Sequence, residues 1–389
     1  MHLLWVANFA PDTGYAWETI ESVFRRVGER LVRDGHRVTV CYASRANAPS
    51  RVMQGAPFAF AAYDYGRGGA RGFVRLLRER GVDALYLTDR ATWSGRYPLY
   101  RLAGVRRIIV HDRTSGARTV RAPAVHLAKR ALHGLPWLSA DCFVAVSDFV
   151  RDRLITVNGT PPARTHRIYN GIDLSRFDGA DRSALPRLLG VDAGRRIVFC
   201  SGRVQPYKGM QTLVDAFALL RDEGLDDVEL AVAGDGPYLE ELRGIAARHD
   251  LRNVHFLGRR TDIPALLAGA TVAVVPSLWE EAFGLAVVEA MAAGVPLVAS
   301  RTGGIPELVE EGGTGMLVPP GDARALADAL RLLLRNPALR GAMAVRGPVT
   351  AHRRFSLDRA AADLCSLVSR QLLASLPTPV PAAVRPARP

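Results

Sequence analysis

The stretch PSLWEEAFGLAVVEAMAAGVP, residues 276–296, decides how the chain folds. A β-rich run, Val272–Val275, leads into it, and a second apolar run, Pro296–Ala299, closes it. Between the two runs, a turn at Gly284 leads into a helical stretch around Leu285–Ala293. A strand, a loop, a helix and a second strand in this order predict a parallel sheet covered by helices.

Two carboxylates, Glu281 and Glu289, lie on either side of the turn in this stretch. Such a pair could act as a general acid and base, bind a metal ion, or hold two ends of one polar ligand. A metal site is disfavoured, because no His accompanies the pair and the chain has no D-x-D sequence. Ligands of open parallel sheets bind beyond the carboxyl ends of the strands, which is where this loop begins.

The same alternation of short β-rich runs and longer amphipathic stretches extends along the chain and restarts once. The predicted strands of the first series are Leu3–Ala7, Val38–Tyr42, Ala84–Leu87, Ile108–Val110, Phe143–Val146 and Arg167–Tyr169; those of the second are Ile197–Cys200, Glu229–Ala233, Val254–Leu257, Val272–Val275, Pro296–Ala299 and Met316–Val318. This pattern predicts an α/β protein with two doubly wound, Rossmann-like domains that face a central cleft.

The expected boundaries follow from the break between the two series. We expect an N-terminal domain over residues 1–170, a polar linker over 171–194 and a C-terminal domain over 195–350. A final helix over 351–374 is expected to pack back on the N-terminal domain, and the Pro-rich tail over 375–389 is expected to be disordered.

A second loop on the same side of the predicted C-terminal sheet carries cations. After the strand Ile197–Cys200, Gly202 allows a sharp turn, and Arg203 and Lys208 follow before a helix that begins near Gln211. Fixed cations beside a helix N-terminus favour a bound diphosphate. A solvated basic loop is the alternative, and the acid-bearing loop later in the same series argues against it.

The two acids of the opening stretch suit the hydroxyl groups of such a ligand. The backbone N–H groups of Phe283, Gly284 and Leu285 would lie at a helix start, where they can hold an anion or a hydroxyl. Glu289, about one turn inside the helix, can accept two hydrogen bonds from a vicinal diol such as a ribose. Glu281, in the loop before the helix, is placed to accept hydrogen bonds from a sugar.

Composition narrows the function classes. Hydrophobic residues make up 48% and charged residues 23% of the chain, as in soluble globular proteins. No apolar run approaches the ~18 residues of a membrane span. The four cysteines are far apart and lack metal-ligand spacing, so we expect reduced thiols. The first residues lack a basic segment before their short apolar stretch, so we expect a cytoplasmic location.

The net charge of +13 lies in the first half of the chain. Residues 1–170 hold 26 Lys and Arg against 13 Asp and Glu, whereas residues 171–389 hold 25 of each. Either an arginine-rich proteome or a field that attracts an anionic substrate or membrane surface would explain this asymmetry. Nucleic acid is not expected as a partner, because no recognition motif or interleaved aromatic patch accompanies the basic residues.

Several motifs together resemble retaining glycosyltransferases of family 4, which have the GT-B fold. They are GRVQPYKG, AGDGPY, PSLWEEAFGLAVVEAMAAGVPLVAS and GGIPELVEEGGTGMLVPPGD in the second half, and ERLVRDGHRVTV, VAVSDFVRDRLI and IYNGIDLSRF in the first. The resemblance covers nearly the whole chain and is most specific over residues 195–322. It implies that the C-terminal domain binds a nucleotide-sugar donor and that the N-terminal domain faces the acceptor.

The resemblance also implies roles for single residues. Arg203 and Lys208, on the loop that turns at Gly202, would neutralise the donor diphosphate, and Glu289 would bind the ribose. Glu281, with the backbone of residues 283–285, would hold the transferred sugar.

Two further parts of the donor site are implied in the same way. Gly258 and Arg259 would contact the nucleotide base, largely through their backbone. His111, at the end of a predicted strand, matches an active-site histidine near the donor sugar; a lone histidine at a strand end is otherwise usually structural.

The first loop, NFAPDTGYAWETI, departs from the family pattern, which has two adjacent glycines there. Only Gly14 remains, and the bulky Tyr15 and Trp17 follow it. This departure puts backbone contact with the donor phosphates or the acceptor in doubt at Gly14, and makes Trp17 a candidate for shaping an acceptor pocket.

The predicted activity is transfer of a sugar from a nucleotide diphosphate sugar to a glycan, lipid-linked or small-molecule acceptor. The resemblance implies that the anomeric configuration is retained, and we expect no cofactor and no metal ion. A nucleotide-sugar epimerase would need groups for proton abstraction that the sequence does not identify. A non-catalytic nucleotide-sugar-binding protein is a second rival. The motifs do not distinguish UDP, GDP and ADP donors.

The segment RAPAVHLAKRALHGLPWL, residues 121–138, bears on the acceptor. It combines basic and apolar side chains, which predicts either an amphipathic helix on an anionic inner membrane surface or a core-facing helix with a solvated edge. The basic residues expected near the acceptor are Arg101, Arg106, Arg107, Arg113, Arg118, Arg121, Lys129 and Arg130.

Overall fold

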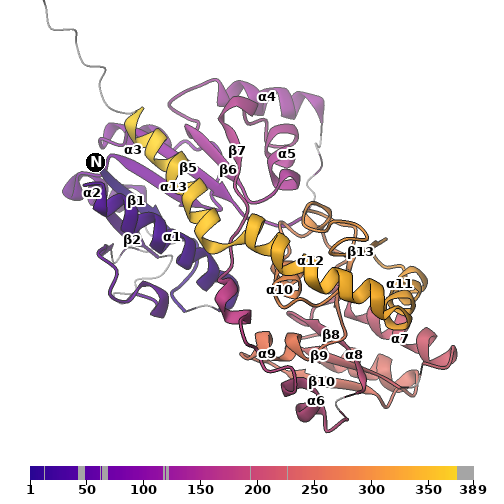
Figure 1. Ribbon diagram of the computed structural model, residues 1–389. Coiled ribbons are helices and arrows are strands. Elements are labelled where there is room, and N and C mark those ends of the chain that lie inside the picture. Colours follow the sequence, from indigo (N-terminus) through magenta and orange to yellow (C-terminus); the bar gives the residue numbers. More distant parts are fainter. Residues whose placement is uncertain are drawn as a thin grey trace, which may run out of the picture.

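The computed structural model describes residues 1–12, 14–42, 49–61, 63, 69–116, 119, 122–192, 194–225 and 227–374. Within these ranges the chain forms two lobes, each built around a parallel β-sheet (Figure 1). The two-domain α/β architecture predicted from the alternating pattern is confirmed. The tail over residues 375–389 lies outside the described residues.

The N-terminal lobe holds, within the described ranges, a seven-stranded sheet in the order β3-β2-β1-β4-β5-β6-β7. Its strands are β1 (His2–Val6), β2 (Arg37–Cys41), β3 (Ala59–Ala61), β4 (Ala84–Thr88), β5 (Arg107–Asp112), β6 (Cys142–Ala145) and β7 (Thr165–Arg167). Its helices are α1 (Tyr15–Arg33), α2 (Ala70–Arg80), α3 (Tyr97–Leu102), α4 (Pro123–His133) and α5 (Asp148–Thr156). The strand order reverses between β1 and β4, and ligands of such sheets bind at the carboxyl end of this switch point.

The C-terminal lobe holds a six-stranded sheet over the described residues, in the order β10-β9-β8-β11-β12-β13. Its strands are β8 (Arg196–Ser201), β9 (Val228–Ala233), β10 (Val254–Gly258), β11 (Val272–Val275), β12 (Leu297–Ser300) and β13 (Gly315–Val318). Its helices are α6 (Ala184–Leu189), α7 (Met210–Asp222), α8 (Leu239–Arg248), α9 (Ile263–Ala268), α10 (Leu285–Ala292) and α11 (Ala323–Arg335). Its switch point lies between β8 and β11.

Most strands are largely apolar because both faces of each sheet are covered. In β1, Leu4 and Val6 belong to one hydrophobic cluster, whereas Leu3 and Trp5 belong to a second cluster on the opposite face. The second cluster includes Leu364 and other residues of the last helix.

Two consecutive helices tie the lobes together. Helix α12 (Pro337–Phe355) packs against α10 of the C-terminal lobe, and α13 (Leu357–Leu373) packs against α1 of the N-terminal lobe. Figure 1 shows this pair, in orange and yellow, running from one lobe to the other. The chain changes direction at Ser356, whose hydroxyl caps α13 by accepting a hydrogen bond from Arg359 N.

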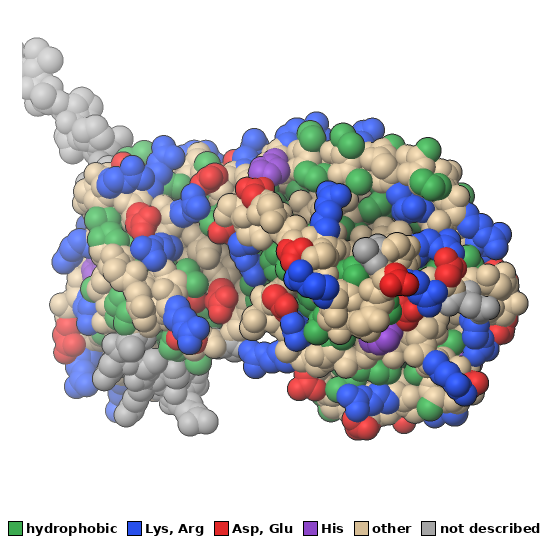
Figure 2. Space-filling view, turned by 60° about the horizontal axis from the view of Figure 1, so that its bottom comes forward, with side chains coloured by type: hydrophobic (Ala, Val, Ile, Leu, Met, Phe, Trp, Pro, Cys, Tyr) green, Lys and Arg blue, Asp and Glu red, His purple; other side chains and the backbone are tan. Residues whose placement is uncertain are grey.

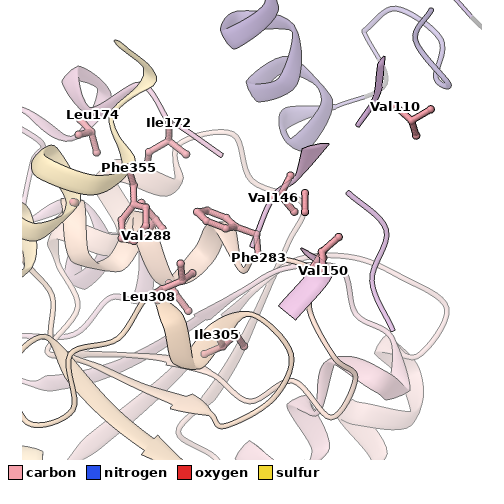
Figure 3. Packing of buried hydrophobic residues seen from close by; sticks show 14 of the residues in the cluster. Val110, Val146, Val150, Ile172, Leu174, Phe283, Val288, Ile305, Leu308 and Phe355 are labelled. Carbon is pink, nitrogen blue, oxygen red and sulfur yellow. The ribbon is translucent and has the colours of Figure 1, made fainter. Parts of the chain in front are cut away.

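A hydrophobic cluster crosses the interface between the lobes (Figure 3). Phe283, just before α10, packs edge-on against Phe355 at a centroid distance of 5.7 Å and lies 5.9 Å from Tyr169. Val146 and Val150 of the N-terminal lobe belong to the same cluster. The start of α10 is therefore fixed at the point where the two lobes meet.

The structure differs from the sequence-based expectation at two strands. Strand β3 was not predicted; it is a three-residue edge strand, AFA, without a β-branched residue. The strand predicted at Arg167–Tyr169 runs instead over Thr165–Arg167, because Tyr169 has already left the sheet to pack on Phe283 and Phe355.

It also differs at two predicted segment boundaries. Residues 184–189, within the predicted linker, form α6, which packs against α9 of the C-terminal lobe through the buried Leu185. The predicted boundary between residues 350 and 351 falls inside α12, and the chain turns only at Ser356. Helix α6 has only six residues, too few to show an apolar period, whereas the start of α13 is marked by its capping residue Ser356.

No helix among the described residues is long and apolar enough to cross a membrane. The four cysteines are buried free thiols, as predicted. Figure 2 shows one face of the molecule, on which Lys and Arg side chains are scattered over both lobes rather than gathered in one patch.

Candidate active site

The two loops that carry the predicted donor residues leave neighbouring strands at the C-terminal switch point. One follows β8 and the other follows β11, and these strands pair in parallel through Val198 and Val272. Loops that leave the carboxyl ends of adjacent strands on either side of a switch point line the ligand crevice of such sheets. The position expected for the site from the sequence is thus the position at which both loops lie.

Gly209 holds the two loops together. It caps α7 in the left-handed conformation, with φ 70°, and a Cβ atom there would lie 1.9 Å from the carbonyl oxygen of Pro276. The backbone N–H groups of Leu278 and Trp279 donate to the Tyr207 carbonyl at 2.9 and 3.1 Å. Only glycine allows so close an approach of the two backbones.

This approach brings a cation and an acid together. Lys208 Nζ lies 2.5 Å from Glu281 Oε1, and the Ser277 hydroxyl donates to the same oxygen at 2.8 Å. Both charged side chains are mostly buried. Arg203 lies on the same loop as Lys208 and is exposed. The structure therefore brings Lys208 and Glu281 together, with Arg203 on the same loop as Lys208.

Gly234 lies between Gly202 and Gly258 and brings the loop predicted to contact the nucleotide base close to the loop after β8. A Cβ atom on Gly234 would lie 1.8 Å from the Gly202 carbonyl oxygen, and the Gly234 N–H donates to the Gly258 carbonyl at 2.8 Å. Arg259 follows and is exposed. The loops after β8, β9 and β10 thus lie side by side at the same edge of the sheet.

The start of α10 follows a buried phenylalanine and a glycine in a backbone conformation that other residues rarely adopt. The Phe283 side chain is buried in the interface cluster, and Gly284 caps the helix with φ 106°. Leu285 is the first helical residue. The first N–H groups of a helix lack partners inside it, so they are available to a ligand.

Glu289 is 7% exposed and lies where three segments meet. Burial raises its pKa to about 7, against the opposing effects of the Tyr15 hydroxyl and the Arg176 charge. The Arg176 guanidinium stacks 4.4 Å from the centre of the Tyr15 ring. Arg176 belongs to a short 3-10 helix, η3 (Leu174–Phe177), between the lobes. The Tyr15 hydroxyl lies near the Glu289 carboxyl but makes no hydrogen bond of good geometry with any described residue.

Tyr15 and Arg176 were not among the predicted site residues. Tyr15 follows Gly14, the cap of α1, and the departure of this loop from the two-glycine pattern was a visible signal. Arg176 carried no comparable signal, because its place beside Glu289 depends on how the linker folds. Trp17 stacks on Phe9 at a centroid distance of 4.7 Å and packs on the N-terminal core.

His111 lies at the carboxyl end of β5, where it is 2% exposed. Its Nδ1 is hydrogen-bonded to the Tyr86 hydroxyl, and its buried Nε2 has no partner among the described residues. Burial, with the charge of Arg113 beside it, lowers the pKa of His111 well below its ordinary value. The imidazole is therefore neutral at neutral pH.

The loop that follows His111 touches the donor loop of the other lobe. The Gly116 N–H donates to the Glu280 carbonyl at 2.8 Å, and the Ala282 N–H donates to the Ser115 hydroxyl at 3.3 Å. Over the part of the chain that the structure describes, no group of three or more His, Cys, Asp or Glu side chains is arranged to hold a metal ion.

Comparison with known proteins gives the same picture. The family model "Glycosyl transferases group 1" matches residues 181–348, and "Glycosyltransferase Family 4" matches residues 20–176. A GDP-mannose-dependent alpha-(1-6)-phosphatidylinositol monomannoside mannosyltransferase of Mycolicibacterium smegmatis is 32% identical over 73% of this chain and 74% of its own length. The chain belongs to the family 4 glycosyltransferases. Like other members, this glycosyltransferase moves a sugar from a nucleotide-sugar donor to a lipid, glycan or small-molecule acceptor.

The chain is also similar to a second sequence relative and to a solved structure. Alpha-D-kanosaminyltransferase of Streptomyces kanamyceticus is 32% identical over 75% of this chain and 78% of its own length. The structure of Anabaena HepE in complex with UDP-glucose superposes with a TM-score of 0.74 at 25% identity, over 95% of this chain and all of the other. The GT-B fold implied by the motifs is confirmed.

Proposed function

We propose that this family 4 glycosyltransferase is a retaining, metal-independent enzyme whose two acids hold opposite ends of the donor. The observation that carries the proposal is the Lys208–Glu281 contact beneath the start of α10, with Glu289 one helical turn further on. Lys208 and Arg203 take the diphosphate, Glu289 takes the ribose, and Glu281 with the backbone of residues 283–285 takes the sugar.

The chemistry needed is stabilisation of a leaving diphosphate. Negative charge grows on the phosphate as the glycosidic bond breaks, and fixed cations with helix N-terminal N–H groups stabilise it. When the donor binds, its phosphate replaces Glu281 as the partner of Lys208, which frees the Glu281 carboxylate to accept sugar hydroxyls. No residue has to act as a nucleophile if the leaving phosphate accepts the proton of the acceptor, which attacks from the same face.

His111 fits a role beside the sugar. Because its Nδ1 is occupied by the Tyr86 hydroxyl, its neutral ring can offer only Nε2 to a ligand. The loop that follows it touches Glu280 and Ala282, which flank Glu281. We infer that His111 Nε2 contacts a sugar hydroxyl when the lobes close on the donor.

The acceptor side supports docking on an anionic membrane surface. On α4, Val125 and Leu127 are 46% and 69% exposed, and Leu135 and Trp137, just after it, are 50% and 54% exposed. An apolar edge of this kind, with Arg130 exposed beside it, suits a helix lying in a lipid interface.

Fewer of the basic residues expected near the acceptor are unpaired than the sequence implied. Asp141 lies within ion-pair distance of Arg101 and Arg107, and Asp83 lies 3.9 Å from Arg106. Arg118 and Arg121 lie outside the described residues. Co-sedimentation with anionic and neutral liposomes at about 0.1 M salt tests the membrane proposal, and equal binding to both kinds would contradict it.

The donor proposal is tested by release of nucleoside diphosphate from a panel of UDP-, GDP- and ADP-sugars, with and without EDTA. We expect one nucleotide class to be turned over, and EDTA to leave the rate unchanged. Loss of activity in EDTA that Mn²⁺ or Mg²⁺ restores would contradict metal independence. Release that Lys208→Ala leaves intact would contradict the assignment of the diphosphate site.

A further inference from the structure

We propose that Asn8 and Arg113, held together by Asp89, form a subsite for an anionic group, a phosphate or carboxylate, carried by the sugar acceptor next to the hydroxyl that is glycosylated. This inference rests on the proposed function and adds the chemical class of the acceptor.

The three residues lie at the switch point of the N-terminal sheet. Asn8 follows β1, Asp89 follows β4, and Arg113 follows β5, so all lie beyond the carboxyl ends of adjacent strands. This is the edge at which a doubly wound sheet binds its ligand. Because the corresponding edge of the C-terminal sheet holds the donor residues, the crevice of the N-terminal sheet is left for the acceptor.

Asp89 organises the cluster. Its carboxylate accepts hydrogen bonds from Asn8 Nδ2 at 3.0 Å and from the Arg113 backbone N–H at 2.6 Å. Its own N–H donates to the His111 carbonyl at 2.8 Å. It does this with φ 49°, a conformation that few non-glycine residues adopt. A strained residue with three such contacts fixes Asn8, His111 and Arg113 relative to one another.

The cluster has polar atoms that nothing in the described part of the chain satisfies. They are Asn8 Oδ1, His111 Nε2 and the Nε and Nη1 atoms of Arg113, all buried. The neighbouring acid Asp112 is already bound by Arg153 at 3.1 Å and by the Thr114 N–H at 2.8 Å. Buried polar groups are nearly always hydrogen-bonded, and a buried cation is nearly always paired. A group that is unpaired in the free protein therefore points to a ligand.

The buried polar atoms that lack hydrogen-bond partners indicate the chemistry of that ligand. A guanidinium with two free donors matches the paired oxygens of a phosphate or carboxylate. Asn8 Oδ1 can only accept, so it suits a hydroxyl adjacent to the anion. Asp89 disfavours a second negative group close to Asn8.

The loop that carries Arg113 also touches the donor site. Ser115 and Gly116 are bonded to Ala282 and Glu280, on either side of Glu281. With the lobes in this arrangement, Arg113 Nε and Nη1 are shielded from solvent. The anion therefore enters when the lobes separate, and it lies next to the transferred sugar when they close again.

The test uses inorganic phosphate as the probe, with the full chain saturated with the preferred nucleoside diphosphate so that the Lys208 site is filled. Phosphate binding is measured by ³¹P line broadening. The variants are Arg113→Gln and, as a control of equal charge change on the same lobe, Arg106→Gln. We expect Arg113→Gln to weaken phosphate binding by about 10- to 100-fold and Arg106→Gln to leave it unchanged. Equal phosphate binding in the wild type and Arg113→Gln would overturn the proposal.

A kinetic arm identifies which substrate carries the anion. Turnover is compared between a polyol and its monophosphate as acceptors, and between a hexose and a hexuronic acid donor. We expect Arg113→Gln to raise KM for the phosphorylated acceptor and to spare the other three substrates. Loss confined to the hexuronic acid donor would overturn the acceptor assignment.

The thermal stability and the nucleotide affinity of the variants provide the remaining controls. Because Arg113 Nε and Nη1 have no hydrogen-bond partner among the described residues, we expect Arg113→Gln to remain folded, and its melting temperature without ligand is measured alongside that of the wild type. Arg113→Lys, which keeps the charge, should recover part of the phosphate affinity. Unchanged nucleotide affinity in Arg113→Gln, together with loss in Lys208→Ala, would show that the donor proposal stands whatever the phosphate result.

Discussion

Glu289 shows how burial can prepare a carboxyl group for a ligand. It lies inside the first turns of α10, with Tyr15 and Arg176 over it, and burial raises its pKa to about 7. The deprotonated carboxylate accepts stronger, charge-assisted hydrogen bonds from the two hydroxyls of a ribose than the protonated group does. Binding of the donor is therefore expected to draw a proton off this group.

This predicts a pH-dependent affinity for nucleoside diphosphate. Because the pKa is raised, the neutral form dominates below pH 7 and the ligand must compete with the proton. We expect affinity to rise between about pH 6 and about pH 8, by up to roughly tenfold per pH unit below the pKa. The phosphate of the ligand also titrates in this range. Glu289→Gln supplies the control, and identical slopes in wild type and variant would contradict the prediction.

A second prediction at the residue scale concerns the cations. Lys208→Ala and Arg203→Ala should each reduce transfer by at least ~10²-fold, the scale on which a fixed electrostatic donor contributes. Lys208→Ala also leaves Glu281 without its partner at 2.5 Å, so circular dichroism and melting must accompany the rates. Near wild-type turnover in either folded variant would show that the diphosphate lies elsewhere.

At the scale of elements, the site depends on loops that only glycine can bring together. Gly209 and Gly234 each place a Cβ position within 2 Å of a carbonyl oxygen in the neighbouring loop. The loops after β8, β9 and β11 are held in one layer by these contacts, and the layer fixes where Lys208 meets Glu281.

Gly209→Ala is therefore expected to abolish donor binding and to destabilise the C-terminal lobe. The added methyl group would meet the Pro276 carbonyl at 1.9 Å, and φ 70° is unfavourable for alanine. Gly341→Ala, in the interior of α12 with nothing within 4 Å, is the matched control. It should retain activity and gain up to about 1 kcal/mol in the free energy of unfolding. Normal nucleotide affinity in Gly209→Ala would contradict the role given to this contact.

Sequence periodicity predicted most elements because both sheets are buried on two faces, which makes nearly every strand an apolar run. It missed β3, a short edge strand of small residues, and misplaced β7, whose neighbour Tyr169 is held by contacts far away in sequence. Most residues proposed for the donor site could be named from the sequence because they lie within short motifs. Tyr15 and Arg176 could not be named in this way, because Arg176 stacks on Tyr15 only once both lobes and the linker are folded.

At the scale of the whole molecule, directional hydrogen bonds between the lobes accompany the hydrophobic cluster that crosses their interface. The Glu307 carboxylate of the C-terminal lobe accepts hydrogen bonds at 2.7 Å from the backbone N–H groups of Asp148 and Phe149, at the start of α5 in the other lobe. A carboxylate at a helix N-terminus is favoured by the helix dipole. This contact therefore stabilises the closed arrangement.

Glu307→Ala should slow transfer by about tenfold or more, because two charge-assisted hydrogen bonds across the lobes are lost. Affinity for the bare nucleoside diphosphate should change little, since the residues assigned to the nucleotide lie mainly in the C-terminal lobe. Glu310→Ala is the control, because Glu310 pairs with Arg346 and Arg353 within its own half of the molecule. A Glu307 variant that loses nucleotide affinity as strongly as turnover would contradict a role in closure.

Glu289 and Glu281 are proposed to bind opposite ends of one donor. Titration calorimetry with the bare nucleoside diphosphate tests this assignment most directly. The ligand contains the ribose and the diphosphate but lacks the sugar. We therefore expect Glu289→Gln to weaken binding by about tenfold or more, the scale of a lost charge-assisted hydrogen bond, and Glu281→Gln to bind nearly as well as the wild type. Equal loss of affinity in both variants would contradict the account.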